Sequence, residues 1–336
     1  MESSLVNLLI ILSIIFLASC SYGSNYDNYY PNDIDFLNQE PGEWFYLSNM
    51  PTARSEISGV KLDSKFYIVG GFEEDTKTSS TFEVYNLKND TWEILDDIPY
   101  PVHHVGIAAF EGKIYISGGW SGLDFVANID SFWSYDVKSG IWEELENMKY
   151  SRAAHRMVEY NGNIYVIGGV GPNSEKIMRY NVKNKTWDII STRMNVPRDH
   201  FSKVLKDNEL YIISGRDGSS ELSIVEIFDF EDYSIKEVND IPIPRGGHVS
   251  EYLDGKIYVI GGELIYNDIV ALNSIQVYDI RENKWYNYID IPVTLHGSAS
   301  TEYNNKIYMF GGAFGPEYET FTTLSNKTLI YEPSQD

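Results

Sequence analysis

A tyrosine in a short apolar run, closed by a glycine pair, decides the fold: Tyr67-Ile-Val-Gly70-Gly71. Five further copies follow along the chain: Tyr115–Gly119, Tyr165–Gly169, Tyr211–Gly215, Tyr258–Gly262 and Tyr308–Gly312. The copy at Tyr211–Gly215 has Ser214 in place of the first glycine. Successive closing glycines lie 48, 50, 46, 47 and 50 residues apart. A period near fifty residues in a strand-rich chain is typical of a repeat array or a propeller.

The second half of each unit has a fixed spacing of its own. An aromatic residue precedes a tryptophan by seven positions in four units: Tyr85 and Trp92, Tyr135 and Trp142, Tyr180 and Trp187, Tyr278 and Trp285. Phe228 and Ile235 keep this register in the fourth unit. Seven residues suit a hairpin with a short polar turn, so each unit is expected to end in two antiparallel strands.

Taken together, the glycine pair and the spaced Tyr and Trp resemble the kelch repeat, over about residues 43 to 332. The resemblance implies an all-β fold, a six-bladed kelch-type β-propeller with one four-stranded blade per repeat. Trp44 has no aromatic partner before it, and the chain ends soon after Tyr331, before a tryptophan could follow. We therefore expect the N-terminal strand to complete the last blade and close the ring.

Composition limits the function classes. The chain has 336 residues and a formal net charge of −23, which argues against nucleic-acid binding because phosphates need a basic surface. The family includes galactose oxidase, whose copper site uses a cysteine cross-linked to tyrosine, but residues 43–336 contain no cysteine. No Walker loop, Rossmann fingerprint or zinc motif is present, so the sequence predicts no cofactor, and we expect a monomer.

The N-terminus resembles a bacterial lipoprotein signal. Residues 5–17 form an apolar run too short to span a bilayer comfortably, and Leu17-Ala18-Ser19-Cys20 resembles a lipobox. An ordinary signal peptide cut nearby is the alternative. The expected domains are a signal peptide (1–19), a lipid-modified Cys20 with a flexible tether (20–42) and the propeller (43–336). This arrangement predicts an exported protein, anchored to the membrane of the cell envelope through Cys20 and facing the periplasm or the exterior.

The segments that lead into each blade carry the first set of candidate site residues. Every histidine of the chain lies in one of them, and arginines recur thirteen residues before the repeat tyrosine. The predicted ligand-binding residues from this set are Arg54, Arg152, Arg198, Arg245, His155, His200 and His248. They are expected to face the channel rim, where Arg suits a carboxylate and His adds a titratable donor. Alternatively, they are repeat residues that hydrogen-bond neighbouring loops.

The histidines fall close to one per blade, without the tight spacing of metal-ligand motifs, so the sequence predicts no metal.

The loops after the glycine pairs carry the second set of candidate site residues. Such loops are common places for function, because a rigid scaffold holds them in position while their sequence is free to vary. Trp120 is a candidate for stacking on a sugar ring. Arg216, Asp217 and Glu263 are candidate anchor and acid–base residues, and the loop at residues 313–325 is long enough to overhang the channel. Exposed charged loop residues are more often merely solvated.

Two functions follow as hypotheses. The first is a binding module that presents its channel rim to a protein, a peptide or an anionic glycan. The second comes from the resemblance, because exported bacterial kelch propellers include N-acetylneuraminate epimerase, the sialic acid mutarotase. There an arginine anchors the sugar carboxylate and a carboxylate side chain assists ring opening, which needs acid and base groups but no metal.

Overall fold

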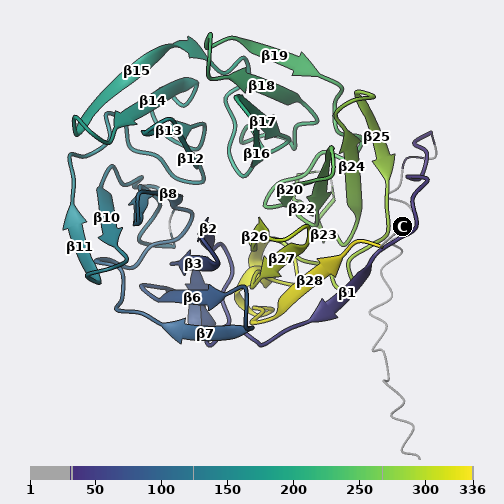
Figure 1. Ribbon diagram of the computed structural model, residues 1–336, viewed down its shortest axis with the longest axis horizontal. Helices are drawn as coiled ribbons and strands as arrows, with labels where there is room; N and C mark the ends of the chain where they lie inside the picture. The colour runs from purple at the N-terminus through teal and green to yellow at the C-terminus, as the bar shows by residue number, and fades with distance from the viewer. Residues whose placement is uncertain (1–30, 32, 124, 267, 335–336) are drawn as a thin grey trace, which may run out of the picture.

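The computed structural model describes residues 31, 33–123, 125–266 and 268–334. These residues form six four-stranded antiparallel sheets arranged radially around a central axis (Figure 1). The prediction of an all-β, six-bladed propeller is confirmed. The signal peptide and Cys20 lie outside the described residues and stay sequence predictions. Within the described part, no helix has the length and apolar character needed to cross a membrane.

Each blade runs from an inner strand at the axis to an outer strand at the rim (Figure 1). The innermost strands are β2 (Ser58–Leu62), β8 (Gly106–Phe110), β12 (Arg156–Tyr160), β16 (Ser202–Lys206), β20 (Val249–Leu253) and β26 (Ala299–Glu302). The second strands, which carry the repeat tyrosine, are β3 (Lys65–Val69), β9 (Lys113–Ser117), β13 (Asn163–Ile167), β17 (Glu209–Ile213), β21 (Lys256–Ile260) and β27 (Ile307–Phe310). After their first residue these second strands are buried on both faces, as continuous apolar runs predict.

The outer half of each blade is a hairpin. The third strands are β6 (Phe82–Asn86), β10 (Phe132–Asp136), β14 (Lys176–Asn181), β18 (Val225–Asp229), β24 (Ile275–Asp279) and β28 (Thr328–Glu332). The outermost strands are β7 (Thr91–Ile94), β11 (Ile141–Glu144), β15 (Thr186–Arg193), β19 (Ile235–Val238), β25 (Lys284–Asn287) and β1 (Glu43–Tyr46). The spaced aromatic residues pair across this hairpin, as Tyr85 does with Trp92.

The hydrophobic core lies between neighbouring blades. The ring of Phe132 on β10 packs edge-on against Tyr180 and Trp187 of the next blade, with ring centroids 4.8 and 5.0 Å apart. The indole N–H of Trp187 also donates to the carbonyl of Glu146, which follows the outer strand of the preceding blade. The repeat aromatics therefore join blades as well as filling them.

The ring closes as predicted. Strand β1 pairs antiparallel with β28, and Trp44 lies opposite Tyr331. Part of the expected tether also packs on the propeller: Leu37 N–H donates to the carbonyl of Asn287 on β25, and Asn287 N–H donates to the carbonyl of Asp35.

In the described part of the chain, two small hairpins and two short 3-10 helices sit in the loops between second and third strands. They are β4 (Phe72–Glu73) with β5 (Lys77–Thr78), β22 (Glu263–Leu264) with β23 (Val270–Ala271), η2 (Glu74–Thr76) and η3 (Glu317–Phe321). These loops and the segments leading into the blades meet at one end of the axis, through short bridges such as Asp199 with Arg216 and Gly246 with Glu263.

Candidate functional site

Six backbone positions form a hydrogen-bonded ring around the axis, which we call the inner ring: Glu56, His104, Ala154, His200, Gly247 and Gly297. Each lies two residues after the arginine position of its leading segment. From His104 onward, each N–H donates to the carbonyl of the preceding member, at 2.9 to 3.4 Å. Ile57 N–H closes the circle on the carbonyl of Gly297, at 3.3 Å. The ring therefore fixes one residue of every blade around the axis.

All six members have left-handed backbone, with φ from 50° to 65°. Glycine adopts this conformation readily, but an L residue loses about 1–2 kcal/mol there. The chain nevertheless has Glu56, His104 and His200 at three of the positions. Left-handed non-glycine residues concentrate at functional sites. These three side chains are therefore the first candidates for a functional site.

The residues that follow the glycine pairs form a second layer beside this ring. Arg216 exchanges two backbone hydrogen bonds with Asp199, both of 2.9 Å, and Glu263 does the same with Gly246. A Cβ at position 246 would lie 2.1 Å from Arg216 Nε. Glycine at that position therefore leaves room for the guanidinium group, which turns toward Glu263 of the neighbouring blade.

These two layers enclose a cavity of about 240 Å³ at the channel mouth, which we call the mouth cavity. It is lined by Glu56, Phe72, His104, Phe125, His200, Arg216, Glu263, Ile265, His296, Glu317, Tyr318, Thr320 and Phe321. The long loop of the sixth blade lies over the mouth as its length suggested, because it supplies the last four of these side chains. Eight titratable groups from five blades thus converge with phenylalanine side chains, a mixture typical of small-molecule sites.

Opposite charges are paired inside the mouth cavity. Arg216 Nη2 lies 2.5 Å from Glu263 Oε1, and Glu317 N–H donates to Glu263 Oε2 at 2.7 Å. His296 Nε2 lies between two carboxylates, 3.6 Å from Glu263 Oε2 and 3.7 Å from Glu56 Oε1. His104 Nε2 lies 2.9 Å from Glu56 Oε2. The cluster is one electrostatic network rather than a set of independent groups.

This network sets the protonation states. Burial alone would raise the pKa of Glu56, but His104, followed by His296 and His200, holds that pKa well below its usual range. Burial also opposes ionisation of Glu263, whereas His296 and Arg216 lower its pKa. Burial lowers the pKa of His200, and Arg216 lowers it further. At neutral pH Glu56 and Glu263 are therefore ionised, His200 is neutral and Arg216 is protonated.

The four repeat arginines do not reach this cavity. Arg54, Arg152, Arg198 and Arg245 are at most 1% exposed, so the expectation that their guanidinium groups face the channel rim is wrong. They bind inside the blades instead: Arg54 to Glu83 and the carbonyl of Gly70, Arg198 to Glu226, Arg245 to Gln276 and the carbonyl of Gly261, and Arg152 to the carbonyls of Pro172 and Asn173. This is the structural alternative that the sequence left open, and our proposed site excludes these four residues.

Only some of the other predicted site residues line the mouth cavity. Arg216, Glu263 and His200 line the mouth cavity. Trp120 is buried at 3% exposure against His103, His104 and Phe125, so it supports the mouth without offering a stacking face. Asp217 is exposed, and its carboxylate accepts hydrogen bonds from the backbone N–H of Ser219 and Ser220. The expectation that Asp217 acts beside Arg216 is therefore not supported by its orientation.

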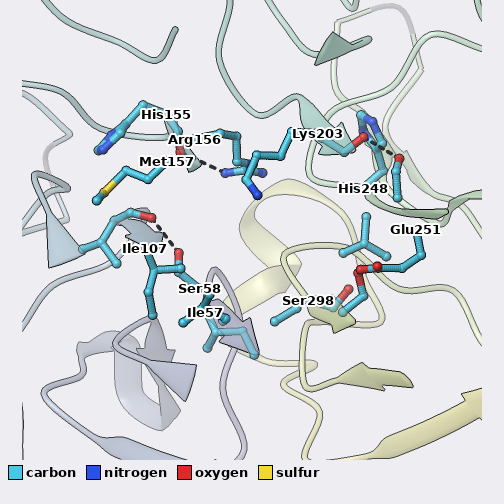
Figure 2. Close-up of a pocket in the computed structure, with 18 residues that line it drawn as sticks. Ile57, Ser58, Ile107, His155, Arg156, Met157, Lys203, His248, Glu251 and Ser298 are labelled. Carbon is cyan, nitrogen blue, oxygen red and sulfur yellow. Dashed lines mark hydrogen bonds between the residues drawn. The ribbon is translucent and has the colours of Figure 1, made fainter. Parts of the chain in front are cut away.

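His155 and His248 line a separate cavity of about 140 Å³, deeper in the channel. Figure 2 shows Arg156 and Lys203 reaching into it, with Glu251 also on its wall. Burial, followed by the charges of Arg152 and Arg156, lowers the pKa of His155 to about 3. Burial lowers the pKa of Lys203 to about 8. Burial also holds the pKa of His248 well below its usual range, so both histidines are neutral residues of the channel wall.

Sequence reasoning missed Glu56, His104 and His296. A usable signal existed, because Glu56, His104 and His200 all stand eleven residues before the repeat tyrosine. Two groups in the described residues bring together atoms that could hold a metal ion: Glu56 with His104 and His200, and Glu56 with Glu263 and His296. Spacing along the chain could not reveal the second group, because its members occupy different positions of the repeat.

Comparison with known proteins agrees with this architecture. The family model for the KLHDC2/KLHL20/DRC7 Kelch-repeats domain matches residues 154–335, and that for the Attractin/LZTR1 beta-propeller matches residues 49–225. Kelch-like protein terF of Aspergillus terreus is 26% identical over 253 residues, covering 66% of this chain and 54% of its own. Kelch-like protein 15 of Danio rerio is 27% identical over 233 residues, covering 67% and 32% respectively. The chain therefore spans about half the length of the first relative and a third of the second.

Among solved structures, YjhT superposes with a TM-score of 0.73 at 14% sequence identity, covering 85% of this chain and 99% of its own. At that identity the likeness shows the fold alone. The family models, each matching more than half of the chain, establish the family directly. The chain belongs to the kelch-repeat β-propeller family.

Proposed function

We propose that the mouth cavity binds a monosaccharide-sized acidic sugar and catalyses opening and closing of its cyclic hemiacetal, the reaction of a mutarotase. The observation that carries this proposal is the convergence of Glu56, His104, His200, Arg216, Glu263 and His296 in one cavity of about 240 Å³. A cavity of this size favours a small ligand over a folded partner.

The reaction needs one base and one acid. A base takes the proton of the anomeric hydroxyl, an acid protonates the ring oxygen, and the carbon–oxygen bond opens to the carbonyl form. The ring then closes on the other face of the carbonyl, and the two protons return. The ionised Glu56 and Glu263 supply bases, and imidazole N–H groups supply the acid. His104 Nε2 and Glu56 Oε2, 2.9 Å apart, already share a proton-transfer geometry.

Arg216 suits the sugar carboxylate. A guanidinium group has five N–H donors, so the pairing of Nη2 with Glu263 leaves others for a ligand. Both Arg216 and Glu263 are nearly buried, so their charges act in a medium less polar than water. A bound carboxylate and the reacting hydroxyl would then lie next to each other.

The test is proton NMR of the α-to-β interconversion of N-acetylneuraminate. The wild-type protein should accelerate it, and Glu263→Gln and Arg216→Lys should each slow the catalysed rate by about tenfold or more. Glu144→Gln, on the exposed outer strand β11, is the matched control and should keep the wild-type rate. Wild-type protein without effect at micromolar concentration would overturn the proposal for this sugar.

The loops around the mouth support a second candidate, the binding of a protein or peptide. Leu123, Ile269 and Tyr318 are 45%, 64% and 77% exposed on the loops of the second, fifth and sixth blades. Exposed apolar side chains mark an interaction surface where they form one contiguous patch, and this candidate requires that these loops do so. On a peptide array, Leu123→Ser with Ile269→Ser should abolish any captured peptide and leave mutarotation intact. Capture unaffected by this double substitution would exclude the loops as the binding surface.

A further inference from the structure

We propose that Glu56, His104 and His200 bind one first-row divalent metal ion of the Zn²⁺ class at the centre of the inner ring. This goes beyond the proposed function, which needs no metal. With a metal ion on Glu56 and His104, Glu263 remains in the mouth cavity as the base and His296 as the imidazole donor. One carboxylate oxygen and one nitrogen from each imidazole lie within 4.8 Å of one another. Two imidazoles and a carboxylate are an established donor set for zinc and for non-haem iron.

The hydrogen bonds around His104 leave room for a cation. Three contacts run in series: His103 Nε2 to the carbonyl of Gly122 at 2.9 Å, His103 Nδ1 to His104 Nδ1 at 2.6 Å, and His104 Nε2 to Glu56 Oε2 at 2.9 Å. Each contact needs one proton, because the carbonyl and the carboxylate at the two ends only accept. Two neutral imidazoles supply two protons. The remaining contact, between His104 Nε2 and Glu56 Oε2, takes either one further proton or a metal ion.

His200 is oriented as metal-binding histidines are. Its Nδ1 contacts the carboxylate of Asp199, which accepts the N–H and leaves the lone pair on Nε2. A carboxylate behind the imidazole fixes the tautomer and makes the other nitrogen a better donor to a metal. His103 holds His104 in the same way through Nδ1. Both imidazoles therefore have the outer partner that metal sites use.

The backbone holds these ligands in place. Neighbouring inner-ring members are joined by hydrogen bonds, and His104 and His200 flank Ala154, whose side chain ends at Cβ. Ligand atoms around tetrahedral zinc lie about 3.4 Å apart, as bond lengths of about 2.1 Å require. The rings of His104 and His200 have centroids 4.9 Å apart, so small side-chain rotations suffice for binding.

The second group, Glu56 with Glu263 and His296, is the weaker alternative. Glu263 is already paired with Arg216 Nη2 and with the N–H of Glu317. A metal on Glu263 would have to displace or crowd a guanidinium charge. A metal on the first group keeps the Arg216–Glu263 pair and leaves its open coordination positions toward the mouth cavity, where a water or a ligand oxygen could bind.

Isothermal titration of the purified, chelator-treated protein with Zn²⁺ tests the site. We expect about one equivalent to bind, with affinity reduced about tenfold or more by His104→Ala and by His200→Ala. His248→Ala, a buried histidine of a leading segment outside the site, is the matched control and should bind as wild type does. Absence of stoichiometric binding would mean that a proton, rather than a metal ion, lies between His104 Nε2 and Glu56 Oε2, and it would overturn the proposal. Equal zinc affinity in the wild-type protein and all variants would also overturn it.

A measurement on the wild-type protein removes any dependence on the folding of the variants. X-ray absorption of the zinc-loaded protein should show two imidazole ligands and only nitrogen or oxygen donors. Fewer than two imidazoles would overturn the assignment. Neither measurement uses a sugar, and the mutarotation test can be run in chelator, so failure of one proposal is distinguishable from failure of the other.

Discussion

His104 Nε2 lies 2.9 Å from Glu56 Oε2, although the two residues belong to leading segments of different blades. Both side chains start from left-handed backbone, and His104 N–H donates to the carbonyl of Glu56. The same two residues are thus joined through backbone and side chains. This pair connects the architecture of the ring to the chemistry of the mouth cavity.

Glu56→Gln should lower the free energy of unfolding by about 1–3 kcal/mol at pH 7, because a buried charged hydrogen bond is lost. The pKa of Glu56 is lowered in the folded protein, so its carboxylate stabilises the fold above the ordinary pKa of 4.5. That contribution disappears as pH falls through the lower folded value. Denaturant unfolding of wild type and variant from pH 7 to pH 3 should therefore converge. A difference independent of pH would contradict the assignment.

Two glycines of the inner ring should differ in their tolerance of alanine. Gly247→Ala should cost about 1 kcal/mol, the penalty of left-handed backbone, because its nearest neighbour to a new Cβ lies at 3.5 Å. Gly297→Ala should cost clearly more, since its Cβ would lie 2.7 Å from Glu56 Oε1 and 2.9 Å from the Glu56 backbone nitrogen. Thermal unfolding compares the two variants. Equal losses would mean that Glu56 does not sit against Gly297.

Gln276→Glu should stabilise the protein by about 1–2 kcal/mol at neutral pH. Arg54 and Arg198 are each paired with a glutamate, Glu83 and Glu226 respectively. Arg245 instead donates a hydrogen bond to the neutral Gln276, and burial lowers the pKa of Arg245 to about 9. Gln276 Nε2 has no hydrogen-bond partner in the described part of the chain, and a carboxylate would remove that unsatisfied donor.

Urea unfolding at pH 7 measures this gain, and the isosteric reverse change Glu226→Gln is its counterpart. Glu226→Gln should destabilise, because it leaves the buried Arg198 without a carboxylate. If Gln276→Glu lowered stability, burial of the new charge would outweigh the pairing.

Trp44→Ala should weaken the pairing of β1 with β28, which closes the ring. The Trp44 ring lies 5.2 Å from that of Tyr331, and β1 is the outer strand that covers β28. Native-state hydrogen exchange should accelerate at the amides of β28 far more than at those of β14, on the opposite side of the ring. Equal acceleration at both strands would mean that closure is not a local event.

The sequence predicted the blades and their closure because both depend on local, repeated features. The glycine pair and the seven-residue Tyr–Trp spacing each indicate one turn of a blade. Trp44 lacked the preceding aromatic residue of its hairpin, and Tyr331 lacked the following tryptophan, so the two were expected to pair with each other. Repetition also made the number of blades countable from the chain alone.

The position of the arginines could not be predicted in this way, because their acceptors lie on another strand. Arg54 and Glu83 are separated by 29 residues, Arg198 and Glu226 by 28. The sequence did contain a signal for these acceptors. In the blades of Arg54 and Arg198, a glutamate stands two residues before the aromatic residue of the third strand, whereas the blade of Arg152 has Met178 at that position. Arg152 accordingly bonds loop carbonyls instead.

Only some residues of the mouth cavity were predicted from the sequence. Arg216 and Glu263 follow glycine pairs and were expected on the functional loops. Glu56 and His104 were not selected, although they share a repeat position with His200, and the meeting of His296 with them depends on the circular order of the blades. The left-handed backbone that aligns three of the side chains has no signature in residue type, because glycine, alanine, histidine and glutamate all occur there.

The central claim is that groups from five blades act as one site at the mouth. The most direct test follows the imidazole nitrogens of the wild-type protein by two-dimensional ¹H–¹⁵N NMR during titration with N-acetylneuraminate. We expect the resonances of His104, His200 and His296 to shift together along one saturable curve, while those of His155 and His248 stay in place. Unchanged spectra, or shifts confined to His155 and His248, would contradict the claim.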